Sequence, residues 1–158
     1  MKKMRYILSL LFCLALCFAD CDDGYTDIDG ECYFISDLNV LVAFANNSPG
    51  LSTEYADILD MSQLLLTWDN GRLTFFQCGV CDFSGSIPPE IGNLTELTNL
   101  VIFFTDIEGS IPSSIGSLTK LTRLNLSNNS LTGSIPSSIG NLSDLENLQL
   151  QNNNFDGS

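Results

Sequence analysis

The chain has 158 residues, with 19 acidic against six basic side chains, a net charge of −13 and no histidine. A surface of this charge repels nucleic acid and anionic membranes, which argues against a polyanion-binding protein. Without histidine, the Ser–His and Cys–His pairs of nucleophilic catalysis are excluded.

Residues 1–19 have the pattern of a secretion signal. Basic residues in the first five positions precede an apolar run from Ile7 to Ala19, which is shorter than the roughly 20 residues that a membrane-spanning helix needs. We expect cleavage after Ala19, although a retained anchor is the alternative. Cleavage would remove three basic residues and no acid, so that three basic and 19 acidic side chains would leave a net charge of −16. The prediction is a protein that is secreted or held at the extracellular face of the cell.

Residues 20–60 are expected to form an N-terminal cap region that begins with a polar arm. Cys21 and Cys32 lie on either side of a turn at Gly30, and export places them in an oxidising compartment, so we predict a disulfide between them. The acids in this arm are spaced somewhat like those of a calcium loop, but they do not meet the EF-hand pattern in register. No metal site or cofactor is therefore predicted.

A helix is expected to follow, starting with Ser36 or Asp37 as its N-cap and ending near Asn46. Leu38, Leu41 and Val42 contribute to its apolar face. A second short helical segment is expected over residues 55–66. Trp68, the only tryptophan, is expected to pack against the cap and the first coil rather than to bind a ligand.

The dominant feature is a 24-residue repeat over residues 85–158, in which units begin at Gly85, Gly109 and Gly133 and a fourth begins at Gly157. The second and third units agree at all eight positions of GSIPSSIG, at four leucines and at two asparagines. A repeat of this length predicts a solenoid, because one unit cannot bury its own leucines and must stack on its neighbours. In the second unit the positions expected to point inward are Leu118, Leu121, Leu124, Leu126 and Leu131, with Ile111 and Ile115 as further apolar fill.

Two further positions in the unit have a physical role. Asn129 falls at the turn after the expected strand, where a side-chain amide can satisfy unpaired backbone groups and stacked copies can form a ladder. Pro112 has no N–H and ends regular pairing on the return path.

Extending the 24-residue period one unit toward the N-terminus from Gly85 makes residues 61–84 a degenerate first repeat. The inward positions are then occupied by Leu73, Phe76, Cys78 and Phe83, and Cys81 takes the place of Asn129. Buried small residues are the interpretation we prefer for the CGVC of Cys78–Cys81, with a redox pair or half a metal site as alternatives. Their disulfide connectivity is left open.

The pattern LxxLxxLxLxxNxLxGxIPxxIGx resembles the plant-type leucine-rich repeat, as in the ectodomains of receptor-like kinases and in polygalacturonase-inhibiting proteins. The resemblance implies an α/β solenoid with short parallel strands on its concave face and a helical N-terminal cap. SDLNVLVAFANN resembles the capping helix of that family, although Asn46 and Asn47 stand where a basic residue is usual. Because the chain stops two residues into a unit, we expect a C-terminally truncated fragment, and membrane association only through a missing C-terminal segment.

The strand positions of the concave face that point outward are the candidate site. An apolar patch is expected beside a field of polar amides, and an exposed aromatic cluster of this kind marks a partner site. The alternative is that the cap folds over the patch. The predicted ligand-binding residues are Phe75, Val80, Val101, Phe103, Phe104, Arg123, Asn125 and Gln149.

The sequence therefore predicts no enzyme and no catalytic residue, but an extracellular module that binds a protein or peptide through the concave face, with the ectodomain fragment of a receptor as one form of it. The alternative is a structural or surface-active repeat protein, ice-binding or adhesin-like, because the amide side chains recur regularly. Phe103 and Phe104 interrupt that array and argue against it. N-glycosylation sequons occur at Asn46, Asn93, Asn125, Asn128 and Asn141.

Overall fold

The computed structural model describes residues 21–49, 51, 53, 54 and 63–156. The signal sequence and its cleavage position therefore lie outside the described residues, as does most of the helical segment expected over residues 55–66. No helix among the described residues is long and apolar enough to cross a membrane.

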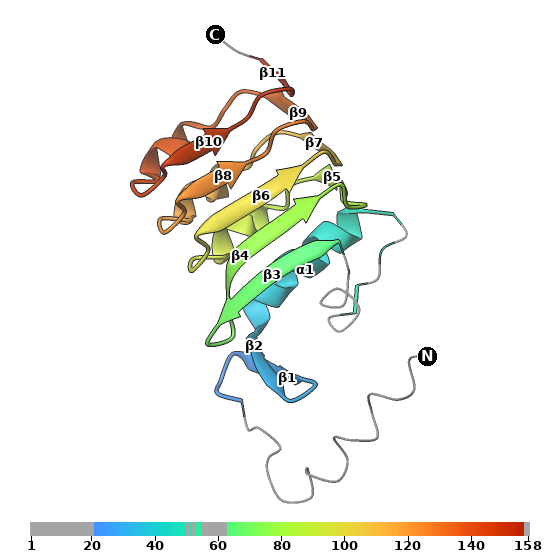
Figure 1. The fold of residues 1–158 in the computed structure, drawn as a ribbon, viewed down its shortest axis with the longest axis vertical. Helices are drawn as coiled ribbons and strands as arrows, with labels where there is room; N and C mark the ends of the chain where they lie inside the picture. Colours follow the sequence, from blue (N-terminus) through green and yellow to red (C-terminus); the bar gives the residue numbers. More distant parts are fainter. Residues whose placement is uncertain (1–20, 50, 52, 55–62, 157–158) are drawn as a thin grey trace, which may run out of the picture.

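A five-stranded sheet runs along the solenoid (Figure 1). Its order is β10-β8-β6-β4-β3, and every pair is parallel except the antiparallel pair of β3 and β4. Equivalent residues of successive coils stand opposite one another, as Phe76, Leu100 and Leu124 do. The 24-residue period of the sequence is thus the pairing register of the sheet. The strands are β3 (Leu64–Asp69), β4 (Arg72–Gly79), β6 (Asn99–Phe103), β8 (Arg123–Asn125) and β10 (Asn147–Gln149).

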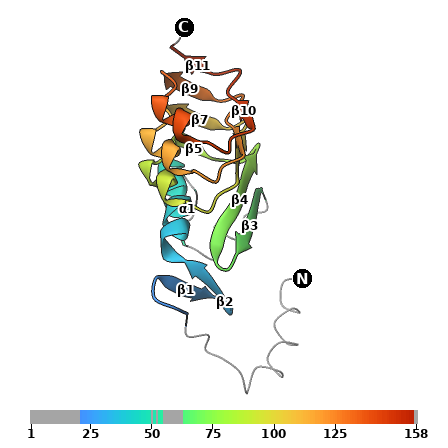
Figure 2. The same ribbon diagram turned by 90° about the vertical axis from the view of Figure 1, so that its left-hand side faces the viewer.

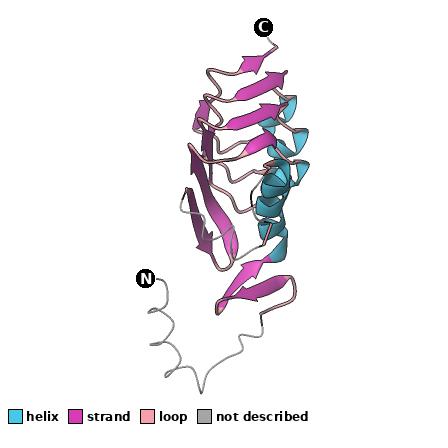
Figure 3. Cartoon of the chain, turned by 90° about the vertical axis from the view of Figure 1, so that its right-hand side faces the viewer, coloured by secondary structure: helices cyan, strands magenta, loops and turns pink. Residues whose placement is uncertain are grey.

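A second, parallel sheet follows the first in each coil, in the order β11-β9-β7-β5. Each coil then closes through a short 3₁₀ helix that begins after a proline, and these helices stack in one column opposite the five-stranded sheet (Figures 2 and 3). The second sheet consists of β5 (Ser84–Ser86), β7 (Asp106–Gly109), β9 (Ser130–Gly133) and β11 (Asn154–Phe155), and the 3₁₀ helices are Pro89–Asn93, Ser113–Ser117 and Ser137–Asn141.

The core lies between the five-stranded sheet and the column of helices. Every leucine and isoleucine predicted to point inward in the second unit is buried, with at most 3% of its surface exposed. In the degenerate first repeat, residues 61–84, Leu73, Phe76, Cys78 and Phe83 are fully buried. The predicted solenoid and its inward positions are confirmed.

The amide ladder is also present. The Nδ2 of Asn129 donates to the carbonyls of Ile102 at 2.9 Å and Leu126 at 3.0 Å. Asn153, one coil later, donates to the carbonyls of Leu126 at 2.8 Å and Leu150 at 3.0 Å. These bonds satisfy backbone groups that the turns leave unpaired, and they join neighbouring coils.

The N-terminal arm is a β-hairpin rather than an irregular segment. Strands β1 (Tyr25–Ile28) and β2 (Glu31–Phe34) pair in antiparallel fashion, and Cys21 is bonded to Cys32 across a Cα–Cα distance of 5.7 Å. The hairpin lies at the end of the molecule opposite the C-terminus (Figure 1). Trp68 of β3 meets Tyr33 of the hairpin edge to face, with ring centroids 4.9 Å apart, and packs against the core, as predicted.

Helix α1 (Ile35–Asn47) covers the first coil as the resemblance implied, but its capping differs from the expectation. No side chain caps its N-terminus. The Asp37 carboxylate, fully buried, instead accepts bonds from the Arg72 Nε at 2.9 Å and from the backbone N–H of Leu73 at 2.8 Å. Asp37 therefore fixes the helix to β4. A second bond, from Arg72 Nη2 to the other Asp37 oxygen at 3.2 Å, makes the ion pair bidentate.

The expectation of a helix over residues 55–66 is wrong for its described end, because Leu64, Leu65 and Leu66 belong to β3. Their side chains alternate between partly buried and exposed positions along the strand. A short apolar run does not distinguish a strand from a helix, and the pairing with β4 decides the outcome here.

Candidate functional site

The candidate site is the face of the five-stranded sheet that points away from the core, which we call the sheet face. Side chains of neighbouring strands form rows across it, because residues paired in the ladder point to the same side. Three rows contain predicted site residues. The rows are Phe75–Asn99–Arg123–Asn147, Gln77–Val101–Asn125–Gln149 and Gly79–Phe103.

Two of the predicted residues are on this face but are not accessible. Val101 is 3% exposed and Asn125 is 8% exposed. Val101 is a short side chain in a row of longer amides, between Gln77 and Asn125. The Asn125 Oδ1 accepts bonds from the backbone N–H of Ser127 at 3.0 Å and from its Oγ at 2.7 Å. Pointing outward is therefore not the same as being exposed, and these two residues are corrected to supporting positions.

The ring of Phe103 lies across the neighbouring strand at Gly79. A Cβ at Gly79 would come within 2.6 Å of two ring carbons of Phe103, so only glycine leaves room for the ring there. Phe103 also meets Phe104, with ring centroids 5.8 Å apart and the rings tilted by 66°. The two rings form an apolar ridge at the end of β6.

Val80 and Phe104 stand out from the sheet at the end of their strands. Val80 is 70% exposed and Phe104 is 57% exposed. Their backbones are in the left-handed region, with φ of 59° and 52°. Non-glycine residues rarely adopt this conformation, and a β-branched residue such as valine is the most strained.

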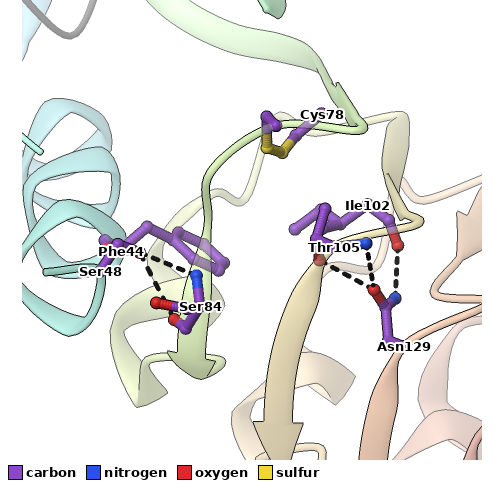
Figure 4. Close-up of a disulfide and its surroundings, with 8 residues drawn as sticks. Phe44, Ser48, Cys78, Ser84, Ile102, Thr105 and Asn129 are labelled. Carbon is purple, nitrogen blue, oxygen red and sulfur yellow. Dashed lines mark hydrogen bonds between the residues drawn. A yellow bond between two sulfur atoms is a disulfide. The ribbon is translucent and has the colours of Figure 1, made fainter.

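The surroundings fix both residues in this conformation. Val80 lies in the four-residue turn closed by the disulfide between Cys78 and Cys81, and its N–H donates to the Phe103 carbonyl at 3.1 Å. Beside Phe104, the N–H and the Oγ1 of Thr105 both donate to Asn129 Oδ1, at 3.0 and 2.8 Å (Figure 4). A strained conformation persists only where its neighbours determine it in this way.

Phe75 and Arg123 lie at the other end of the strands, whereas Gln149 lies in the row of Gln77 and Val101. Phe75 is half-buried and Arg123 is exposed, in the same row but in strands separated by β6. In the described part of the chain Arg72 and Lys120 form ion pairs with Asp37 and Glu96, so Arg123 is the basic side chain there without an ion pair. Gln149 is half-buried in the last row position, in β10. The exposed apolar side chains of Val80 and Phe104 thus lie at one end of the strands, and the exposed Arg123 lies at the other.

Sequence reasoning missed Leu65, which is 55% exposed and stands opposite Gln77. It extends the sheet face by one apolar side chain onto β3. The alternation of LLLTWD over residues 64–69 was the signal that could have identified this strand.

An open pocket of about 470 Å³ lies outside the sheet face, at the N-terminal hairpin. It is lined mainly by polar groups, from Cys21, Asp22, Tyr25, Glu31, Cys32, Asn70 and Gly71. No group of three or more histidine, cysteine, aspartate or glutamate side chains that could hold a metal ion occurs among the described residues.

Comparison with known proteins agrees with this architecture. Residues 95–155 match the family model described as leucine rich repeat. The ectodomain of the receptor kinase SOBIR1 from Arabidopsis thaliana has a TM-score of 0.63 at 24% identity, over 78% of this chain and 70% of that one. The structure of PEPR1 with AtPEP1 has a TM-score of 0.65 at 26% identity, over 77% of this chain but only 18% of that one. The BIR3–SERK2 complex from Arabidopsis thaliana has a TM-score of 0.54 at 24% identity, over 77% of this chain and 84% of that one. No curated protein sequence matches.

The protein therefore has the leucine-rich repeat fold, and residues 95–155 are leucine-rich repeats. Ectodomains of plant receptor kinases are its structural neighbours.

Proposed function

We propose that this leucine-rich repeat chain is an extracellular recognition module that binds a protein or peptide on the sheet face. The anchors are Val80, Phe103 and Phe104. The observation that carries the proposal is the exposure of Val80 and Phe104, 70% and 57%, on a backbone that is unfavourable for both. Large apolar side chains at the centre of an interface commonly contribute most of its binding free energy.

The repeat itself supports this assignment, because folding does not require aromatic residues at these positions. One coil later Ser127 and Asn128 occupy the places of Phe103 and Phe104, and Asn128 keeps the left-handed backbone of Phe104 while the solenoid continues into β9. The scaffold is therefore compatible with small polar residues there. The two phenylalanines contribute a surface that the solenoid does not need.

An extracellular location is supported by the signal pattern of residues 1–19 and by the two disulfides, which form in oxidising compartments. The structural similarity to PEPR1, whose structure is one with AtPEP1, supports a protein or peptide as the partner class.

The test is the double variant Phe103→Ser, Phe104→Asn, which copies the next coil. We expect it to fold, with thermal stability equal to or higher than that of the wild type, and to lose capture of partners from extracellular extract. The control is Ile35→Ser, which removes an apolar side chain that is 37% exposed at the start of α1, outside the sheet. This control should capture the same partners as the wild type.

Two results would contradict the proposal. If the double variant unfolds, the phenylalanines are part of the packing and the site assignment fails. If it folds and captures the same partners equally well, the binding surface lies elsewhere.

A further inference from the structure

Two coils of the solenoid differ from the other two at a pair of positions. The left-handed position that follows the parallel strand of each coil in the five-stranded sheet is apolar in the first two coils, Val80 and Phe104, and asparagine in the next two. Two residues further on, the first two coils have an acid and the next two have a polar uncharged residue. The pairs are Val80 with Asp82, Phe104 with Asp106, Asn128 with Ser130, and Asn152 with Asn154.

The apolar and the acidic side chains stand together on the rim of the sheet face. The residue between the two members of each pair, Cys81 or Thr105, is buried, and both acids are exposed. Asp106 begins β7 and Asp82 precedes β5, so both acids lie where the chain turns from the first sheet into the second. In the second sheet Asp106 stands opposite Ser84, and Asp82 precedes Ser84 by two residues on the neighbouring coil. At roughly 4.8 Å between strands and 3.3 Å per residue, the backbones of the two acids are about 8 Å apart, so both carboxylates can act on one cation.

No basic side chain of the described residues neutralises this rim. Arg123, the one without an ion pair, belongs to the row of Asn99, at the other end of the strand from Phe103. Four residues of strand separate these rows, which is about 13 Å at roughly 3.3 Å per residue. The two carboxylates therefore have no basic side chain of the described residues to offset their charge.

We propose that the occupant of the Val80, Phe103 and Phe104 ridge is a peptide segment that carries an apolar side chain close to a lysine or arginine. This inference rests on the proposed function and specifies its partner. The apolar side chain packs on the ridge, and the cation lies between Asp82 and Asp106. A cation at this position is attracted by the face of the aromatic ring and by the opposite charge of the two carboxylates.

Charge complementarity favours this occupant over a second copy of the chain. A second copy is equally acidic and would bring its own Asp82 and Asp106 against the first pair. Like charges placed across an interface oppose association.

The test uses a displayed library of random dodecapeptides as the probe. The protein is produced in the bacterial periplasm with its disulfides formed, so that the sequon at Asn128 beside the ridge carries no glycan. Selected peptides are synthesised and titrated by fluorescence anisotropy against the wild type, Phe103→Ser/Phe104→Asn, and Asp82→Asn/Asp106→Asn. Asp22→Asn/Asp23→Asn is the matched control, because it removes the same charge from exposed acids at the N-terminal arm.

We expect the selected peptides to be enriched in lysine or arginine beside an apolar residue. Their affinity should fall roughly 3- to 10-fold in Asp82→Asn/Asp106→Asn, as expected for two partly exposed charge pairs, and should stay unchanged in the Asp22→Asn/Asp23→Asn control. It should also fall as the salt concentration rises from about 50 to about 500 mM.

Three results would overturn the inference. Peptides that need Phe103 and Phe104 but show no basic enrichment and no response to Asp82→Asn/Asp106→Asn would refute the cationic partner and leave the proposed function standing. Selection of no peptide that depends on Phe103 and Phe104 would refute both. A dimer of the purified protein that disappears in Phe103→Ser/Phe104→Asn would identify a second copy as the occupant instead.

Discussion

Replacing Val80 by asparagine should stabilise the protein, although it removes an apolar side chain. Val80 has a φ of 59° and is 70% exposed. A left-handed backbone costs an ordinary L-residue about 1–2 kcal/mol, and asparagine tolerates it better than any β-branched residue. Full burial of a valine contributes about 1.5–3 kcal/mol, so the part of this side chain that is buried contributes roughly a third of that. The backbone strain therefore outweighs the packing that the substitution removes.

We therefore expect Val80→Asn to raise the free energy of unfolding by about 0.5–1 kcal/mol, or about 2–5 °C in Tm for a domain of this size. Non-reducing thermal and urea unfolding, followed by circular dichroism, would measure the change. The reciprocal control is Asn128→Val, at a φ of 57° in the next but one coil. It should destabilise, because it places valine in the same conformation and removes the bond that Asn128 Oδ1 accepts from Asn152 Nδ2 at 2.7 Å.

A lower Tm for Val80→Asn, or no loss of stability in Asn128→Val, would refute this reasoning. Either result would mean that the left-handed backbone is not strained at these positions, or that Val80 contributes more packing than its exposure indicates. Backbone strain at Val80 would then no longer support a role for this residue in binding.

Three further predictions concern the scaffold. Arg72→Met should lower the free energy of unfolding in urea by about 2–4 kcal/mol, because it leaves the fully buried Asp37 carboxylate without its cation. The double variant Asp37→Asn/Arg72→Met should lose less stability than Arg72→Met alone, and an equal or larger loss would contradict this explanation. Leu124→Ala should cost about 2–5 kcal/mol in free energy of unfolding, because it leaves a cavity in the core. Asn125→Ala should cost about 1–2 kcal/mol, because it removes the hydrogen bonds that Asn125 accepts from Ser127; for an exposed outward position the expected cost would be about half a kcal/mol or less. An Asn125→Ala variant as stable as the wild type would show that those bonds do not contribute. The hydrogen bond from Lys120 lowers the pKa of Glu96 in the folded protein. The ion pair therefore stabilises the fold above the ordinary glutamate pKa, and this stabilisation is lost as the pH falls through the lower pKa of the folded state. Because the pair is exposed, Lys120→Met should reduce stability only slightly at pH 7 and not at all at pH 2, and an equal loss of stability at the two pH values would contradict the ion pair.

The solenoid could be predicted from the sequence because its periodicity is a direct record of burial. Apolar side chains that recur every 24 residues can be buried only when the coils stack on one another. In the second unit Leu118, Leu121 and Leu124 are such side chains, and each is fully buried. Asn129 could be placed for the same reason, since a turn that recurs every 24 residues needs a recurring partner for its backbone groups.

The N-terminal end could not be predicted in the same way because it does not repeat. Asp37 was expected to cap a helix, which is a local role, but it pairs with Arg72 from 35 residues away. The run Leu64–Leu66 was expected to be helical, and only its pairing with β4 makes it a strand. Contacts of this kind depend on which segments meet, and a single sequence without a period contains no direct signal for them.

The sheet face was predicted only in part, because strand alternation gives the direction of a side chain and not its surroundings. Val101 points outward as expected, but it is nearly covered in its row. The left-handed backbone at Val80 and Phe104 also has no signal of its own in those residues. It becomes visible through Asn128 and Asn152, the residues that the repeat places at the same position.

The contrast between these coils indicates where binding free energy is available. In the last two coils the asparagines already satisfy one another, because Asn152 Nδ2 donates to Asn128 Oδ1 at 2.7 Å and Asn128 Nδ2 donates to Ser127 Oγ at 3.2 Å. A partner that binds there must replace existing hydrogen bonds, so its net gain is small. Val80 and Phe104 have no such compensation, and covering them removes exposed apolar surface from water without breaking any bond. We therefore expect a partner to gain most on the first two coils, with the polar coils after them acting mainly as scaffold.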